Sequence, residues 1–189
     1  CQTEAEIEII HTKGDKILDV SFDKIEGKGF FTKELEDALL NQTIDLAIHS
    51  MKDLPTTSPA GLCLGGVSYR EDPRDCLLIS QMGWDDTKPL KLKPNAVVGT
   101  SSVRRKAQMM DLRNDISTSD LRGNVPTRIR KLREGNYDAI ILAKAGLLRL
   151  NLDLSDLHIV DLHPAEFVPA PAQGVLAYQC RESDIELRK

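Results

Sequence analysis

Short apolar runs that each lead into a helix start place the strongest constraint on the fold of this chain. Residues 96–99 are strand-like and precede the capping hydroxyls of Ser101 and Ser102. Residues 116–118 precede a helix with proline in its first turn, and residues 137–143, the best strand signal, precede a short helical segment. Strands that alternate with helices in this way predict an α/β fold.

The first third of the chain shows the same alternation. Residues 7–12 predict a strand, and residues 32–40 predict an amphipathic helix. Residues 45–49 predict a short buried strand of a parallel sheet, because the apolar run ends in a loop that contains Pro55.

A polar loop over residues 21–29 separates the first strand from the first helix. It carries two glycines and the cations Lys24 and Lys28, which makes it a candidate mobile lid. A plain solvent-exposed loop fits the same composition.

Proline-rich segments mark where the chain crosses between domains. Residues 55–66 are rich in Pro, Gly, Ser and Thr, and residues 168–174 hold too much proline for a regular element. The apolar run that follows is expected to return as a strand of the first domain. We therefore expect an incomplete domain 1 over residues 1–68 and 172–189, domain 2 over residues 73–166, and hinge crossings over residues 69–72 and 167–171.

Composition excludes several classes of protein. The chain has 189 residues, of which 41% are hydrophobic and 29% charged, as in ordinary globular proteins. No apolar run approaches the roughly 20 residues that cross a bilayer, and no basic-then-apolar signal begins the chain. Its four cysteines lie far apart, without zinc or redox spacing. We therefore expect a cytoplasmic protein with reduced thiols, no metal site and no membrane partner.

Charge is unevenly distributed along the chain. The net charge is −4, yet residues 101–150 hold eleven Lys and Arg against five Asp and Glu. A nucleic-acid partner is not expected, because the arginines fall at helix starts and only 4% of the residues are aromatic. A solvated basic face without function remains the alternative.

Two arginines stand in the first turn of the helix that follows residues 96–99. Cations are disfavoured there by the helix dipole, so Arg104 and Arg105 require a bound anion or an acidic neighbour. Surface salt bridges are the structural alternative. Arg122 and Arg128 bracket the next helix start, and Arg149 follows residues 137–143. Three strand-to-helix turns thus present basic groups, and an anionic substrate is expected.

A carboxylate lies beside a cation directly after the buried strand of the first domain. Ser50, Lys52 and Asp53 follow residues 45–49, and ligands of open α/β sheets collect at the carboxyl ends of strands. Asp53 is therefore the candidate catalytic residue.

Several motifs in one order give the chain a family resemblance. The segments are HSMKDLP, REDPRDCLL, VGTSSVRR, LRGNVPTR, YDAIILAKAGLLRL and PAPAQG. Together they resemble the porphobilinogen deaminase (hydroxymethylbilane synthase) family from about residue 7 to about residue 182. The resemblance implies two type II periplasmic-binding-protein-like domains with mixed, mainly parallel sheets and a two-stranded hinge. It also implies an active cleft between these domains and a third, smaller domain.

The resemblance implies a transferase of tetrapyrrole biosynthesis. Such enzymes join four porphobilinogen molecules head to tail, release ammonia each time and yield hydroxymethylbilane. Asp53 matches the family's catalytic aspartate, which stabilises the cation left when ammonia leaves. The expected partners of the acetate and propionate groups of the pyrroles are Arg104, Arg105, Arg122, Arg128, Arg149, Lys52, Ser50, Ser101, Ser102, Lys24 and Lys28.

The chain departs from the family pattern at both ends. The Thr-Arg-x-Ser-x-Leu-Ala signature is missing, as is the third domain, whose cysteine holds the dipyrromethane cofactor. None of Cys1, Cys63, Cys76 and Cys180 matches that cysteine. We therefore expect a truncated monomer that lacks dipyrromethane and is inactive by itself. Lys144 is an additional cation without an assigned role.

A second hypothesis comes from another class of protein. A two-lobed module of the periplasmic-receptor type could close on a small anion, and the fold alone permits it. Asp53 discriminates the two hypotheses, because a pure anion receptor gains nothing from a carboxylate among arginines.

Overall fold

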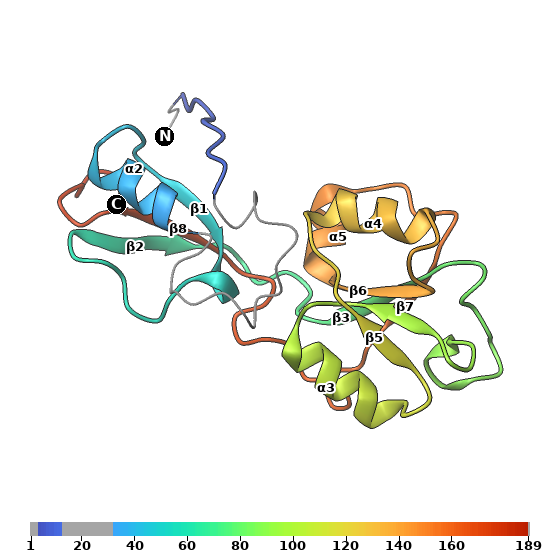
Figure 1. Cartoon of the computed structure of the whole chain (residues 1–189). Coiled ribbons are helices and arrows are strands. Elements are labelled where there is room, and N and C mark those ends of the chain that lie inside the picture. Colours follow the sequence, from blue (N-terminus) through green and yellow to red (C-terminus); the bar gives the residue numbers. More distant parts are fainter. Residues whose placement is uncertain (1–3, 13–31, 189) are drawn as a thin grey trace. The chain divides into compact units, whose positions relative to one another are not determined.

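The computed structural model describes residues 4–12 and 32–188, which form parts of two compact units (Figure 1). The first unit contains the described residues up to Tyr69 and those from Val175 onward, and the described residues of the second are Arg70–Gly174. The chain thus passes between units after Tyr69 and after Gly174. The domain limits expected from the sequence stay predictions, as does the role of the two crossing segments as a hinge.

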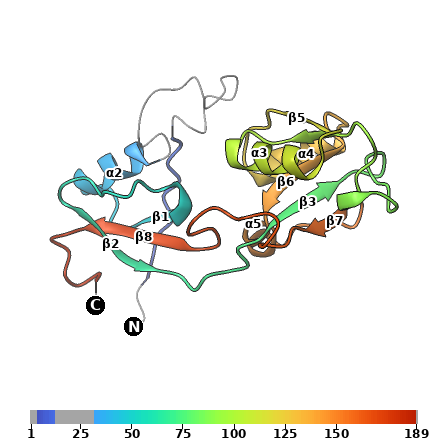
Figure 2. The same cartoon turned by 90° about the horizontal axis from the view of Figure 1, so that it is seen from below.

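In the described part of the first unit, helix α2 packs on a three-stranded sheet. Its elements are α2 (Lys33–Leu40), β1 (Ala47–Ser50), η2 (Met51–Asp53), β2 (Leu62–Val67) and β8 (Leu176–Arg181). The sheet has the order β1-β8-β2 (Figure 2). Leu39 of α2 packs on Ala47 and Leu62, so the helix predicted over residues 32–40 and the return strand predicted after residue 174 are confirmed.

Strand direction in this sheet corrects the sequence-based expectation. β8 is antiparallel to both β1 and β2, whereas β1 was expected in a parallel sheet. β1 is also buried only at alternate positions, with Ile48 60% exposed, so the expectation of a fully buried strand is wrong as well. An apolar run of this length shows neither how deeply a strand is buried nor which strand pairs with it. The strand that pairs with β1 is β8, which lies near the other end of the chain.

Two predictions concern the region before α2. The predicted strand over residues 7–12 is wrong, because residues 4–12 have no regular structure and Ile7 and Ile9 are exposed. No described strand pairs with them, so the apolar alternation has no face to bury. The candidate lid at residues 21–29, with Lys24 and Lys28, lies outside the described residues.

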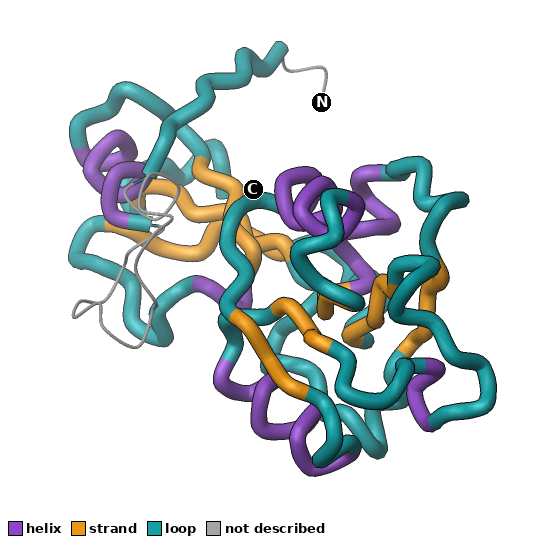
Figure 3. Tube along the Cα trace, turned by 45° about the vertical axis from the view of Figure 1, so that its right-hand side comes forward, coloured by secondary structure: helices purple, strands orange, loops and turns teal. Residues whose placement is uncertain are grey.

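The second unit is a five-stranded mixed sheet covered on both faces. Its elements are β3 (Asp75–Ile79), η3 (Pro89–Lys91), β4 (Val97–Gly99), α3 (Val103–Leu112), β5 (Ser117–Ser119), α4 (Val125–Arg133), β6 (Ala139–Ala143), α5 (Lys144–Leu150) and β7 (His158–Asp161). The long connection between β3 and β4 is loop apart from η3 (Figure 3). The strand order is β5-β4-β6-β3-β7.

The sheet of the second unit is mixed, as the family resemblance implied. β4 is parallel to β5 and β6, whereas β3 is antiparallel to β6 and β7. Over both units, the expectation of mainly parallel sheets is therefore wrong for the described strands, because antiparallel pairs outnumber parallel ones. β3 and β7 bring in the antiparallel pairs of this unit, and neither carries a signal of direction in its sequence.

Helices cover the two faces of this sheet separately (Figure 1). Met109 of α3 packs with Leu77 and Ile141 on one face. Ile129 of α4 and Leu147 of α5 pack on the other face. β3 is buried at all five positions, which identifies it as the centre of the core. Among the described residues, no helix has the length and apolar character that crossing a membrane requires.

Candidate functional site

The arginines predicted from the sequence lie at one end of the strands of the second unit's sheet, which we call the arginine edge. The parallel strands β4 and β6 end there, and α3 and α5 begin there. Because β3 is antiparallel to β6, its first residue, Asp75, pairs with Ala143 at the same edge. Charged groups that are distant in sequence therefore meet at the carboxyl ends of the parallel strands, where ligands of α/β sheets bind.

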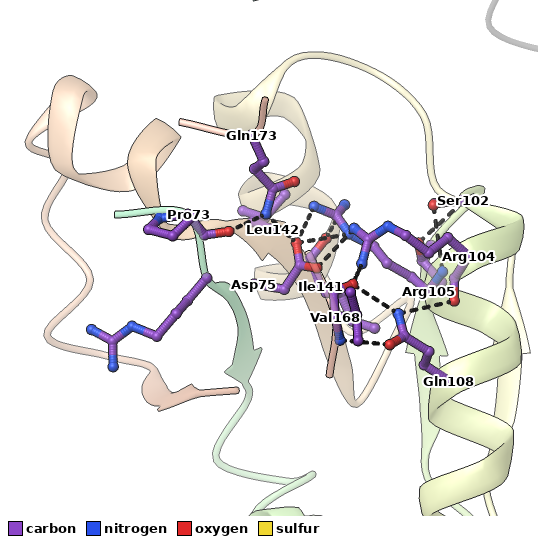
Figure 4. A network of polar contacts seen from close by, with 12 residues as sticks. Pro73, Asp75, Ser102, Arg104, Arg105, Gln108, Ile141, Leu142, Val168 and Gln173 are labelled. Atoms are coloured by element: carbon purple, nitrogen blue, oxygen red, sulfur yellow. Dashed lines mark hydrogen bonds and ion pairs between the residues drawn. The ribbon is translucent and has the colours of Figure 1, made fainter. Parts of the chain in front are cut away.

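Arg105 forms a buried ion pair with Asp75 (Figure 4). Its Nε and Nη2 donate to Asp75 Oδ1 at 3.1 and 2.7 Å, and its Nη1 donates to the carbonyl of Ile141 at 3.1 Å. The Arg105 side chain is 7% exposed and that of Asp75 is fully buried. Asp75 is thus the acidic neighbour that a cation in the first turn of α3 requires.

Arg104 meets the second oxygen of the same carboxylate. Its Nη2 lies 2.8 Å from Asp75 Oδ2, and its Nη1 donates to the carbonyl of Val168 at 2.5 Å. Among the described residues, no donor is aligned for a hydrogen bond to Oδ2, so this contact is an ion pair. The guanidinium also lies 5.9 Å from the ring centre of Phe167, within the range of a cation–π contact. The side chain remains 26% exposed.

Gln173 completes the surroundings of Asp75. Its Nε2 donates to Asp75 Oδ1 at 3.0 Å and to the carbonyl of Pro73 at 2.7 Å. Gln108 of α3 holds the backbone of Val168 with both ends of its amide, at 2.6 and 3.1 Å. Sequence reasoning missed Asp75 and Gln173 as site residues. Asp75 could have been found from the sequence, since a carboxylate at the start of a fully buried strand must find cationic partners.

The two serines before α3 form hydrogen bonds with the backbone of Leu121 and with the first turn of α3. Ser101 Oγ donates to the carbonyl of Leu121 at 3.1 Å and accepts from its N–H at 3.0 Å. Ser102 is the N-cap of α3 and accepts from the Arg105 N–H at 3.5 Å. These bonds fix the turn that carries the arginines.

The three remaining arginines lie on neighbouring turns of the same unit. Arg122 follows β5 and is buried. Arg128, in the first half of α4, donates from Nε to the carbonyl of Gly123 at 2.7 Å. Arg149, exposed in α5, donates from Nη2 to the carbonyl of Gly174 at 2.7 Å. Their role in carboxylate binding stays a prediction.

Ser50, Lys52 and Asp53 belong to the first unit. Ser50 ends β1, and Lys52 and Asp53 lie in the short helix η2, exposed to solvent. The Met51 N–H donates to the carbonyl of Val175 at 3.0 Å, which ties η2 to the entry of β8. The predicted placement of Asp53 directly after a strand is therefore confirmed, and its catalytic role stays a prediction.

His49, in the same motif, is a core residue. Its Nε2 lies 3.0 Å from Gln179 Oε1, and burial lowers the pKa of the imidazole. Lys144, whose role the sequence left open, pairs with Asp161 at 2.8 Å. Lys144 is the first residue of α5 and therefore lies at the same end of the sheet as Asp75, with its charge paired.

A hollow of about 630 Å³ lies at the opposite end of the second unit's strands, next to Ser80 after β3 and Asp138 before β6. Its lining includes Lys93 and Asp138, which pair with each other at 2.7 Å. No group of three or more His, Cys, Asp or Glu in the described chain could hold a metal ion. The arginine edge therefore remains the candidate site of this unit.

Comparison with known proteins identifies the family. The family model "porphobilinogen deaminase, dipyromethane cofactor binding domain" matches residues 1–189. Porphobilinogen deaminases of Bacillus subtilis and Listeria welshimeri are 50% and 48% identical over 96% and 97% of this chain, which spans 56% and 58% of their lengths. A Brucella ovis periplasmic binding protein with glutathione bound is 17% identical, with a TM-score of 0.52 over 82% of this chain and 48% of its own. It shares the fold, which bears out the predicted α/β architecture of the type II periplasmic-binding-protein kind. This chain belongs to the porphobilinogen deaminase family.

Proposed function

We propose that this chain is the substrate- and cofactor-binding part of a hydroxymethylbilane synthase, which condenses porphobilinogen head to tail with release of ammonia. Each pyrrole carries an acetate and a propionate, so a growing chain of pyrroles is strongly anionic. We expect the second unit to bind these carboxylates and Asp53 of the first unit to act on the reacting group.

The charge balance around Asp75 is the observation that carries this proposal. Two guanidinium groups, those of Arg104 and Arg105, share one buried carboxylate, so the cluster keeps a net positive charge. Replacing buried ion pairs by apolar residues is often neutral or stabilising, so stability alone does not account for the cluster. A cation held in a fixed orientation and still partly exposed, as Arg104 is, suits the recognition of a carboxylate.

The dipyrromethane cofactor of the family fits this donor set. It also consists of pyrroles with acetate and propionate groups, and the expected partners are Arg104, Arg105 and Arg149 with the turn that Ser101 and Ser102 fix. When bound, dipyrromethane supplies the pyrrole carbon to which the first substrate is joined. The burial of Cys76 and Cys180 supports the expectation that neither thiol forms the thioether.

Asp53 is proposed to stabilise positive charge. Loss of ammonia from porphobilinogen leaves a cation that is delocalised onto the pyrrole nitrogen, and a nearby carboxylate lowers the energy of that state. Its position in η2, directly after β1, holds the carboxylate on a short element anchored to the sheet. A small-anion receptor, the alternative from the sequence, shares only the fold and offers no use for this group.

The experiment places this chain in the corresponding segment of the Bacillus subtilis enzyme and measures porphobilinogen consumption and bilane formation. We expect activity in this chimera and none in the isolated chain, and we expect both to be monomers. Asp53→Ala in the chimera should abolish turnover while binding of porphobilinogen is kept. Asp37→Asn, at an exposed carboxylate of α2, is the matched control and should leave the rate unchanged.

The outcomes separate the hypotheses. Near-normal turnover of the Asp53→Ala chimera would remove the catalytic role of this residue. An inactive chimera that binds simple dicarboxylates but no pyrrole acids would favour the anion receptor.

A further inference from the structure

Two cysteines face each other across the sheet of the first unit. Cys63 of β2 and Cys180 of β8 are directly opposite in the antiparallel register. Their Sγ atoms lie 3.9 Å apart. Opposed residues of antiparallel strands have Cα atoms about 4.5–5.5 Å apart, and disulfides span about 4.4–6.8 Å between Cα atoms. The backbone can therefore accommodate a bond between the two sulfurs after side-chain rotation alone.

The local backbone leaves space beside the Cys180 sulfur. A Cβ at position 65 would lie 2.9 Å from Cys180 Sγ, so Gly65 keeps this space open. The register of the two strands shifts between Leu64 and Gly66, directly after Cys63. Such a shift disrupts pairing close to Cys63, while Cys63 itself stays in register with Cys180.

The two thiols differ in accessibility. Cys63 is partly exposed, whereas Cys180 is fully buried. Burial, with the neighbouring Cys63 thiol, raises the pKa of Cys180. An oxidant from solution therefore reaches Cys63 first, and Cys180 is placed to react only with Cys63 Sγ once that sulfur is bonded to the small thiol.

We propose that Cys63 and Cys180 form a redox-active pair that a small-molecule disulfide converts into an intramolecular disulfide. The Cys63 thiolate attacks one sulfur of the small disulfide, and one small thiolate leaves. The Cys180 thiolate then attacks Cys63 Sγ, the second small thiolate leaves, and the bond between β2 and β8 forms. The two cysteines lose two electrons, the small disulfide gains them, and the protons of the two cysteine thiols pass to the two released thiols.

The bond would connect the central strand of this sheet to an edge strand. It would also close a loop that contains the described residues of the second unit, because Arg70–Gly174 lies between the two cysteines. Cross-linking residues so far apart in sequence restricts the unfolded chain. Oxidation is therefore expected to stabilise the first unit reversibly, independently of the proposed catalytic function.

The test uses the 189-residue chain with Cys1→Ser, treated with oxidised glutathione under native conditions and analysed by intact mass and peptide mapping. We expect a product that has lost two hydrogen atoms, carries no glutathione and contains a cross-link from Cys63 to Cys180. Its thermal midpoint, followed by circular dichroism, should rise and return to the starting value with dithiothreitol.

Two variants separate the steps. Cys180→Ala should stop at a stable glutathione adduct on Cys63, and Cys63→Ser should not react, because the remaining thiols are buried. Cys76 is the internal control, since burial raises its pKa to about 12. A glutathione adduct that persists on Cys63 of the Cys1→Ser chain, or unchanged thiols after treatment, would overturn the proposal.

Discussion

Removing the charge of Asp75 is the sharpest test of the cluster at the arginine edge. Asp75→Asn keeps the shape of the side chain but leaves Arg105, whose side chain is 7% exposed, as a buried cation without its partner. Removing one partner of a buried ion pair costs about 3–5 kcal/mol, mainly because the remaining charge is uncompensated. We therefore expect the second unit to lose about 3–5 kcal/mol of its free energy of unfolding.

The chain offers a selective probe for this measurement. Its single tryptophan, Trp84, packs against the core of the second unit, so its fluorescence reports on that unit in a urea titration. With an m-value of about 2 kcal/mol/M, the loss should lower the urea midpoint by about 1.5–2.5 M. The m-value itself should stay unchanged if the fold is kept.

An exposed carboxylate of α3 provides the matched control. Asp111→Asn removes the same charge at the surface and should change the free energy of unfolding by less than about 0.5 kcal/mol. If Asp75→Asn shifted the midpoint no more than Asp111→Asn does, the claim that Asp75 compensates a buried Arg105 would be refuted.

Two further predictions concern single residues of the second unit. Gly123 has φ +112°, and a Cβ there would lie 2.7 Å from Thr127 Cγ2, so Gly123→Ala should cost about 1–3 kcal/mol in the same fluorescence assay. Gly135→Ala, at φ +81° with open space around it, should cost less. A hydrogen bond from Arg113 lowers the pKa of Asp115 to about 2. Its contribution to stability is present above the unfolded pKa of about 3.9 and is lost as pH falls toward 2. A carboxyl NMR titration with a midpoint near 3.9 would contradict this.

Local sequence signals predicted the elements with strong periodicity and clear caps. Asn124 caps α4 by accepting from the Thr127 N–H at 2.9 Å, and proline stands in the first turn. Both groups act within one turn of the chain, which is why sequence reasoning located this helix. Residues 7–12 show the limit, since an apolar alternation forms a strand only where another strand pairs with it.

Long-range partners account for what the sequence missed in the candidate site. The position of Arg105 in the first turn of α3 could be read locally, but its partner Asp75 lies 30 residues earlier and is brought close only by the antiparallel pairing of β3 with β6. Gln173, 98 residues after Asp75, reaches the carboxylate from the segment that leads back to the first unit. The local sequence pattern around Arg105 or Gln173 contains no signal for these contacts with Asp75.

The structure shows the salt bridges that the sequence offered as one alternative for the two arginines, and their role in anion binding stays a prediction. Asp75 compensates one guanidinium charge. Arg105 is almost fully buried, and its three guanidinium nitrogens donate to Asp75 and to the carbonyl of Ile141. Arg104 shares the same carboxylate but stays 26% exposed, so the net charge of the pair is best available to a ligand at Arg104. Under the proposed function, the salt bridge with Asp75 would orient the Arg104 guanidinium toward the carboxylate of a ligand. Loss of Asp75 should consequently weaken carboxylate binding as well as stability.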